Sequence, residues 1–251
     1  MTELLYLPSI DAAYERGFRA RITALPPGGV VLDRTLFYPA GGGQPCDRGT
    51  MNADGGNAFE IVDVTKSGDA VLHRLGRRGT PAGLTVGGEV SGTIDWERRH
   101  RHMRLHTLQH LLSARLFAIE GRRTNRATMA GTGGLVDLDG ALAGPESLLA
   151  LAADVRAHLQ RGLPVKVGFV PRIDYEKWSG GRSGQAPLPA HVDPVRVVEI
   201  DAADRCPCGG THVRSTAEVG EFEVTGPTPL PGGAVRVSFT LSEGSPPIPR
   251  A

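Results

Sequence analysis

Short runs of alternating or β-branched apolar residues dominate the first part of the chain. Turn sequences rich in Gly and Pro separate five such runs, which lie at 18–25, 30–38, 59–64, 70–75 and 89–96. Several short strands at this spacing are typical of a small β-barrel or sandwich. We therefore predict a β-rich N-terminal domain over residues 1–96.

The pattern changes at Glu97, where a segment without Gly or Pro begins that extends to Glu120. Apolar side chains recur in it at intervals of three and four residues, namely Leu105, Leu108, Leu112, Leu116 and Ile119. This stripe is typical of a helix with one buried face. Gly121 then provides a plausible stop, so we predict a helix over 97–120.

The remainder mixes both periodicities. We predict a second helix over 146–161, with Leu148, Val155 and Leu159 facing inward. Strand-like segments follow at 165–170, 195–200, 220–224 and 234–241, and we expect the last two to form a hairpin. We interpret the Gly/Pro/Ser-rich stretch 178–191 as a surface loop and the tail 245–251 as frayed. The predicted second domain, 97–245, is therefore α+β.

Composition narrows the class of protein. Hydrophobic residues make up 40% and charged residues 22%, which is ordinary for a soluble globular protein. No segment approaches the length of a membrane-spanning run, and the N-terminus does not resemble a secretion signal. The three cysteines are too few, and odd in number, for a disulfide framework. We therefore expect a cytoplasmic protein without a membrane partner.

Basic residues gather where the first predicted helix begins, although the net charge is only +1. The cluster comprises Arg98, Arg99, Arg101 and Arg104, with His100 and His102 among them, and Arg122, Arg123 and Arg126 follow the same helix. A charge of +1 is too small for the field of the whole protein to indicate nucleic acid as a partner. The cluster itself has two interpretations, a local basic surface or an ordinary solvated helix face.

Two histidines in the first predicted helix are candidate metal ligands. His106 and His110 are four residues apart, so both imidazoles project from one face, beside the leucine stripe. This spacing also arises by chance, through packing or at a surface. The zinc-protease motif HExxH further requires a Glu after the first His, where this chain has Thr107, so a metalloprotease is disfavoured.

A second pair of candidate ligands lies about 100 residues later in CGGTH, where Cys208 and His212 are also four apart. The intervening glycines permit a tight turn, and a thiolate with imidazoles suits Zn²⁺. The alternative is a free cysteine in a glycine turn beside unrelated histidines. Cys206 competes with Cys208 for the role of thiolate ligand.

The motifs HTLQHLL (106–112) and CGGTHV (208–213) resemble the two metal motifs of the alanyl-tRNA synthetase editing domain and of its stand-alone relatives, the AlaX trans-editing proteins. Segments 32–50, 92–107 and 195–200 resemble further parts of the same family, and the match runs from about residue 30 to 240. The resemblance implies a small β-barrel-like N-terminal domain and a C-terminal α+β editing domain of the threonyl/alanyl-tRNA synthetase second additional domain type. It further implies that the aminoacyl end of tRNA binds between the domains.

The resemblance also assigns roles to residues. It implies that Zn²⁺ is bound by His106, His110, Cys208 and His212, and it favours Cys208 over Cys206 because Cys208 keeps the family spacing to His212. The residues implied for the editing pocket are Thr35 and Gln44 as catalytic and Gly42 and Gly43 as substrate-binding, the glycines matching a motif associated with seryl-tRNA. Cys46 is interpreted as incidental. We expect Thr35 or Gln44 to select serine through its hydroxyl.

The implied activity is hydrolysis of the ester between a wrong amino acid, serine or alternatively glycine, and tRNA(Ala). No nucleotide cofactor is expected, and the length leaves no room for a class II aminoacylation core. With three protein ligands zinc would activate water, whereas four would close its shell, and the sequence leaves both open. The competing hypotheses are an editing domain for another tRNA, such as tRNA(Thr), and a zinc-stabilised RNA-binding module without hydrolytic activity.

Overall fold

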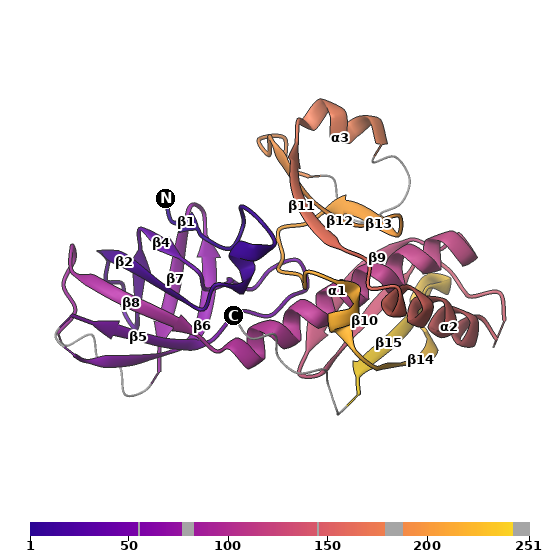
Figure 1. The fold of residues 1–251 in the computed structure, drawn as a ribbon, viewed down its shortest axis with the longest axis horizontal. Coiled ribbons are helices and arrows are strands. Elements are labelled where there is room, and N and C mark those ends of the chain that lie inside the picture. The colour runs from indigo at the N-terminus through magenta and orange to yellow at the C-terminus, as the bar shows by residue number, and fades with distance from the viewer. Residues whose placement is uncertain (55, 77–82, 145, 179–187, 243–251) are drawn as a thin grey trace. The chain divides into compact units, whose positions relative to one another are not determined.

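The computed structural model describes residues 1–54, 56–76, 83–144, 146–178 and 188–242. They form two compact units, the first from Met1 to His102 and the second from Met103 onward. The division falls inside the long helix α1, Trp96–Glu120. Helices and strands are both present (Figure 1), which confirms the predicted mixed fold.

The first unit is built on six strands that close on one another. Their order is β2 (Gly17–Ala24), β3 (Gly29–Leu32), β7 (Ala70–Leu75), β6 (Ala58–Ser67), β5 (Gly49–Ala53) and β8 (Glu89–Ile94). Each neighbouring pair is antiparallel, and β8 pairs with β2 to close the ring. A closed barrel leaves none of these six strands with an unpaired edge. A two-residue strand β1 (Glu3–Leu4) pairs in parallel with β4 (Arg34–Thr35), and a 3-10 turn, η1, covers Asp11–Tyr14.

The sequence pattern mispredicts two parts of this unit. The single strand predicted over 30–38 is wrong beyond Leu32: a break at Asp33 separates β3 from β4, and Leu36–Tyr38 are buried without strand pairing. Strand β5 was missed because its sequence, GTMNA, carries only one large apolar side chain. It pairs with the next strand, β6, and with β8, which lies about 40 residues further along the chain.

Helix α1 follows its predicted course closely. The carboxylate of Asp95 accepts the N–H of Arg98 at 3.1 Å, which is an N-terminal capping interaction, and Gly121 follows the last helical residue with a φ of +66°. The predicted leucine stripe is confirmed, since Leu105, Leu108, Leu112 and Leu116 are at most 1% exposed. The prediction that Ile119 belongs to the buried stripe is wrong, because this residue lies in the last turn of the helix and is 43% exposed.

The second unit contains a four-stranded antiparallel sheet beside α1 and α2 (Ser147–Gln160). Its order is β14 (Phe222–Pro229), β15 (Val235–Leu241), β10 (Gly133–Leu138) and β9 (Thr124–Ala130). The predicted C-terminal hairpin is confirmed as β14 and β15, whereas β9 and β10 were not predicted. An ion pair of 2.5 Å between Arg115 and Asp154 joins α1 to α2, and Arg156 lies over the ring of Phe222 and joins α2 to β14.

The second unit also contains a separate three-stranded sheet, whose last strand ends directly before Cys208. Strand β12 (Val195–Ile200) pairs on one side with β11 (Val165–Val170) and on the other with β13 (Asp204–Pro207). Helix α3 (Arg172–Trp178) was not predicted, and 3-10 turns cover Thr216–Val219 (η2) and Pro231–Gly233 (η3). Most of the predicted loop 178–191 and the tail 245–251 lie outside the described residues.

The basic cluster at the start of α1 divides into buried and more exposed residues. Arg98 and Arg101 are half-buried, and Arg123 and Arg126, which follow the helix, are exposed. Arg99, His100, His102 and Arg104 are each at most 5% exposed. Arg99 donates to both carboxylate oxygens of Asp47, and Arg104 donates to the carbonyl of Val219 at 2.7 and 2.8 Å. These buried cations are hydrogen-bonded structural groups rather than a basic surface, and only the charge pattern was visible in the sequence.

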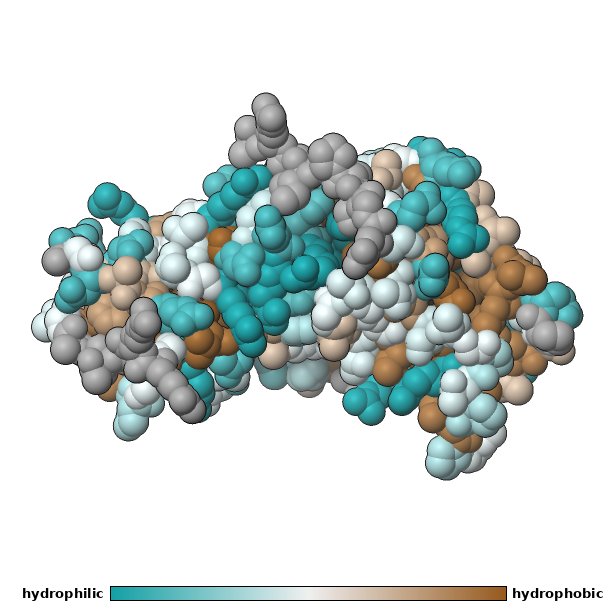
Figure 2. Space-filling model, turned by 90° about the horizontal axis from the view of Figure 1, so that it is seen from below, coloured by the Kyte–Doolittle hydropathy of each residue, from teal (hydrophilic) through white to brown (hydrophobic). Residues whose placement is uncertain are grey.

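The described helices include none with the length and apolarity that crossing a membrane requires. Large hydrophobic side chains that are exposed are scattered along the chain, namely Met1, Val86, Ile119, Leu149, Phe169 and Ile173. The face in Figure 2 accordingly shows hydrophobic areas interspersed with hydrophilic ones.

Candidate functional site

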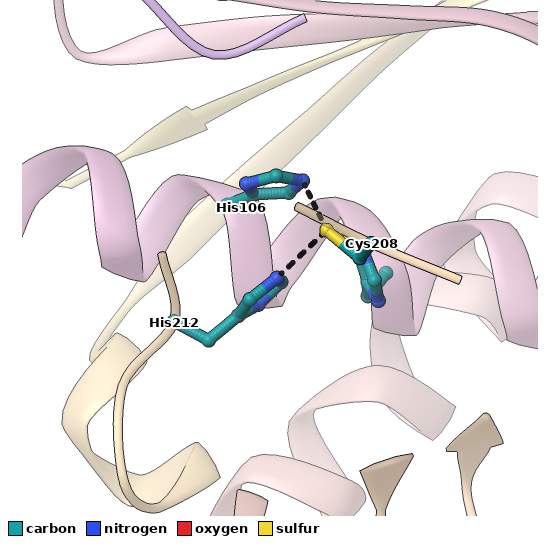
Figure 3. A group of neighbouring side chains, drawn as sticks. His106, Cys208 and His212 are labelled. Carbon is teal, nitrogen blue, oxygen red and sulfur yellow. Dashed lines mark hydrogen bonds between the residues drawn. The ribbon is translucent and has the colours of Figure 1, made fainter. Parts of the chain in front are cut away.

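The two predicted half-sites come together in the second unit. One nitrogen or sulfur atom from each of four residues lies within 4.8 Å of the others, in His106, His110, Cys208 and His212. The first two project from α1, and the last two from the loop after β13, so segments about 100 residues apart meet at one point (Figure 3). The histidines are buried and the cysteine is half-buried.

The separations between these atoms fit a zinc ion. Tetrahedral Zn²⁺ with its usual bond lengths places sulfur and nitrogen ligands about 3.5 Å apart. In the structure, Cys208 Sγ lies 3.6 Å from Nε2 of His106 and 3.3 Å from Nε2 of His212. Three imidazoles and one thiolate are also an ordinary donor set for zinc. The residues present therefore fit the metal that the sequence suggested.

Backbone contacts fix the position of Cys208. Its N–H donates to the carbonyl of Arg196 on β12, and the Arg196 guanidinium donates to the Cys208 carbonyl. The N–H of Gly210 donates to Cys208 Sγ at 3.3 Å. As the sequence suggested, the segment brings Cys208 and His212 together, with Sγ 3.3 Å from Nε2. The glycines are not required for this, because neither has a positive φ and a Cβ at Gly209 would meet nothing within 4 Å.

The charges of the cluster favour a thiolate at Cys208. Burial alone would raise the pKa of this thiol, but the imidazoles of His106 and His212 outweigh burial and lower the pKa well below its usual value. Burial, together with the neighbouring His106 and His110, lowers the pKa of His212. A thiolate beside a neutral imidazole is the protonation state in which both bind a metal.

A second set of donors, which the sequence interpretation missed, shares His110. Nδ1 of His110 lies 2.9 Å from Asp204 Oδ2 and 3.4 Å from Cys206 Sγ. These three residues also satisfy the distance criterion for a possible metal site. Burial opposes protonation of His110, but Cys206 and Asp204 outweigh it and raise its pKa, and burial raises the pKa of the Cys206 thiol. The alternating spacing of Asp204, Cys206 and Cys208 was the signal in the sequence.

Thr107, which stands where a protease would have Glu, contacts the same cluster. Its hydroxyl oxygen lies 3.2 Å from Nδ1 of His212 and accepts the N–H of Val213 at 3.3 Å. Thr107 has no exposed surface. Through these two contacts it supports the loop segment that carries His212.

The predicted pocket residue Thr35 lies in the first unit and has no exposed surface. Its hydroxyl is 2.8 Å from Nε2 of His73, and it accepts the N–H of Phe37 at 3.0 Å. Nδ1 of His73 faces the carbonyl of Val30 at 3.2 Å, so Nδ1 carries the proton and Nε2 accepts from Thr35. Burial lowers the pKa of His73 to about 4, which keeps the ring neutral.

The other predicted pocket residues form a tight turn in the same unit. The backbone groups of Gly41 and Gln44 hydrogen-bond to each other in both directions, at 2.9 and 3.1 Å. The two residues between them, Gly42 and Gly43, have φ values of +56° and +80°, which a type I′ turn requires. The Tyr38 hydroxyl donates to the Gly41 carbonyl at 2.8 Å. Gln44 is 2% exposed, whereas Gly42 is exposed.

Two family descriptions match this chain. Residues 9–98, which hold the six-stranded barrel, match the family described as class II (A) tRNA synthetases. Residues 195–239, which include Cys208 and His212, match the threonyl and alanyl tRNA synthetase second additional domain. The barrel and the cysteine–histidine segment thus each resemble a part of tRNA synthetases.

Individual relatives agree. The alanine–tRNA ligase of Methanothrix thermoacetophila is 32% identical over 92% of this chain, and that of Pyrobaculum neutrophilum is 34% identical over 95%. The chain spans about a quarter of the length of these ligases, 25% and 26% respectively. The alanyl-tRNA editing protein AlaX-M of Saccharolobus solfataricus is 30% identical over 96% of this chain and 99% of its own length. The chain therefore belongs to the family of AlaX-M alanyl-tRNA editing proteins.

Proposed function

We propose that this protein hydrolyses the ester that joins serine to tRNA(Ala), with glycyl-tRNA(Ala) as a second substrate, and that it needs Zn²⁺ to do so. The convergence of four donor atoms from α1 and the loop after β13 is the observation that carries the proposal. Similarity to an alanyl-tRNA editing protein over 99% of that protein's length supports the substrate class. We expect the reaction to take place in the cytoplasm.

The chain offers a complete set of zinc ligands. His106, His110, Cys208 and His212 would hold the ion, which would supply a fixed positive charge and order the loop after β13. Because four donors converge, the site resembles the closed shells of structural zinc more than the three-ligand shells that activate water. We therefore assign the handling of water and substrate to other residues.

The reaction breaks the bond between the amino acid carbonyl carbon and the ribose oxygen. Water adds its oxygen to that carbon, and the ribose oxygen leaves with a proton. The Gly41 N–H is used inside its turn, so among these glycines we assign the N–H groups of Gly42 and Gly43 to the carbonyl oxygen. We assign Gln44 to hold the water, and Thr35 to accept a hydrogen bond from the serine hydroxyl.

Deacylation of seryl-tRNA(Ala) tests the proposal, with bound zinc measured on the same samples. Wild-type protein should release serine, and His106→Ala should lose both zinc and activity. His191→Ala, which changes an exposed histidine, should retain both. Release of serine from tRNA(Thr) but not from tRNA(Ala) would favour the other editing class. Salt-dependent tRNA binding without any release would identify an RNA-binding module instead.

A further inference from the structure

The buried carboxylate of Asp204 lies directly behind one of the candidate zinc ligands. Oδ2 of Asp204 is 2.9 Å from Nδ1 of His110, and the two side chains are 0% and 5% exposed. A carboxylate can only accept hydrogen bonds. Nδ1 of His110 therefore carries a hydrogen and donates a hydrogen bond to Asp204. Nε2 is then the nitrogen that His110 can offer to a metal.

His212 repeats this arrangement on the other side of the cluster. Its Nδ1 lies 3.2 Å from the hydroxyl of Thr107, while its Nε2 lies 3.3 Å from Cys208 Sγ. In both rings Nδ1 contacts an oxygen of the protein, and in His212 Nε2 faces the thiolate. Outer partners of this kind fix the orientation of a metal-binding histidine, and a carboxylate, which only accepts, also fixes its tautomer.

Strand β13 delivers Asp204 to this position. Asp204 is its first residue and pairs with Ile200 of β12, and Cys208 follows its last residue. The same short strand therefore positions both the carboxylate of Asp204 and the thiol of Cys208. A shift of β13 along β12 would move the two groups together.

On this basis we infer that Asp204 is a positioning residue that orients His110 for zinc, which deepens the proposed function and rests on its zinc site. Cys206 offers a different use of His110, because its Sγ lies 3.4 Å from the same Nδ1. With Asp204 it would form a second cation site. Nδ1 cannot donate a hydrogen bond to Asp204 and bind a cation at the same time. The distance of 2.9 Å from Nδ1 to Asp204 Oδ2 is that of an ordinary charge-assisted hydrogen bond. The geometry therefore favours positioning.

Zinc affinity and stoichiometry test the inference without any tRNA. Asp204→Ala should weaken zinc binding by about 10- to 100-fold in a chelator competition, the range seen when such outer partners are removed. Asp204→Asn keeps an amide oxygen that can accept from Nδ1, so it should recover most of that loss. Cys206→Ser should bind one zinc per chain with an affinity within about threefold of wild type, because the inference gives Cys206 no bond to zinc.

A merely structural role for Asp204 predicts a different result. In that case Asp204→Ala would lower the thermal stability of the zinc-free protein, and zinc would stabilise the variant as much as it stabilises wild type. The positioning role requires the zinc-induced stabilisation itself to shrink. Unchanged zinc affinity in Asp204→Ala would overturn the inference, as would two zinc ions per wild-type chain with one lost in Cys206→Ser. If zinc binding responds as expected but seryl-tRNA(Ala) stays intact, the inference holds and the proposed function fails.

Discussion

The hydroxyl of Thr35 donates a hydrogen bond to Nε2 of His73 inside the barrel, across 2.8 Å. Because Thr35 also accepts the N–H of Phe37, a single acceptor site remains on its oxygen. Toward another molecule Thr35 can therefore accept a hydrogen bond but cannot donate one. The role that we propose for it is accordingly recognition of a hydroxyl.

We expect Thr35→Val to lower the rate on seryl-tRNA(Ala) about tenfold, which corresponds to the loss of one hydrogen bond near 1.4 kcal/mol. The rate on correctly charged alanyl-tRNA(Ala) should not fall, since alanine has no hydroxyl. Thr35→Ser is the matched control and should retain discrimination. If Thr35→Val and Gln44→Ala both leave the ratio of the two rates unchanged, neither residue selects serine.

The buried His73 should make stability depend on pH. Its pKa is lowered to about 4 in the folded state from about 6.5 unfolded, so the unfolded chain binds more protons between these values. The free energy of unfolding should then fall as the pH drops from 6.5 toward 4, by about 2 kcal/mol at pH 5. Above about pH 7.5 this contribution is constant. The measurement is urea unfolding of wild type and His73→Gln at pH 7 and pH 5.

Gln can accept from Thr35 but does not titrate in this range, so His73→Gln should show a smaller loss between the two pH values. Equal losses in both proteins would contradict the assignment of this pH dependence to His73.

The pair of Arg99 and Asp47 shows what the sequence could not reveal. Both side chains are 0% exposed, and Arg99 donates further to the carbonyls of Leu36 and Ala13. Asp47→Ala should cost about 3–5 kcal/mol of unfolding free energy, because it leaves a buried guanidinium without its counter-ion. Glu89→Ala removes an exposed pair with Arg21, 2.6 Å long, and should cost less than about 1 kcal/mol. Similar costs in denaturant unfolding would refute this account of burial.

Local patterns were enough to predict α1, the helix over 147–160 and most strands, because each has a clear apolar period or run. The same patterns failed for β5, β9 and β10. β5 and β10 each pair with a strand distant in sequence, β8 and β15, and β9 pairs with the neighbouring β10. They also failed for the segment after Leu32, where the polar residues 33–35 divide the predicted strand into two strands and a buried loop.

The candidate ligands were predictable because each pair has its own spacing of four residues, within a helix or within a short loop. Their partners were not. Asp204 contacts His110 from 94 positions away, and Thr107 contacts His212 from 105. The alternating spacing of Asp204, Cys206 and Cys208 places the Asp near the thiols, but it does not identify His110 as its partner. Nothing in the local sequence pairs Thr107 with His212, so the fold is needed to identify both contacts.

Removal of the metal should expose its contribution to stability. If zinc binds only the folded protein, free zinc at 100 times its dissociation constant stabilises by about 2.7 kcal/mol. A chelator should therefore lower the melting temperature of wild type, and zinc should restore it. Cys208→Ser should abolish this response, while Cys46→Ser, a buried thiol in the first unit, should keep it. A melting temperature that is indifferent to both chelator and zinc would contradict the metal site.

The hydroxyl of Thr107 gives the last prediction, because two groups depend on it. It contacts Nδ1 of His212 and accepts the N–H of Val213, so Thr107→Val preserves the shape of the side chain but leaves both groups without this partner. We expect a loss of about 1–3 kcal/mol in the stability of the zinc-free protein, together with weaker zinc binding of about tenfold. Thr107→Ser keeps the hydroxyl and should lie near wild type in both measurements. Chelator competition on the two variants separates the effects: an intact zinc affinity in Thr107→Val would show that Thr107 supports the loop backbone without orienting His212.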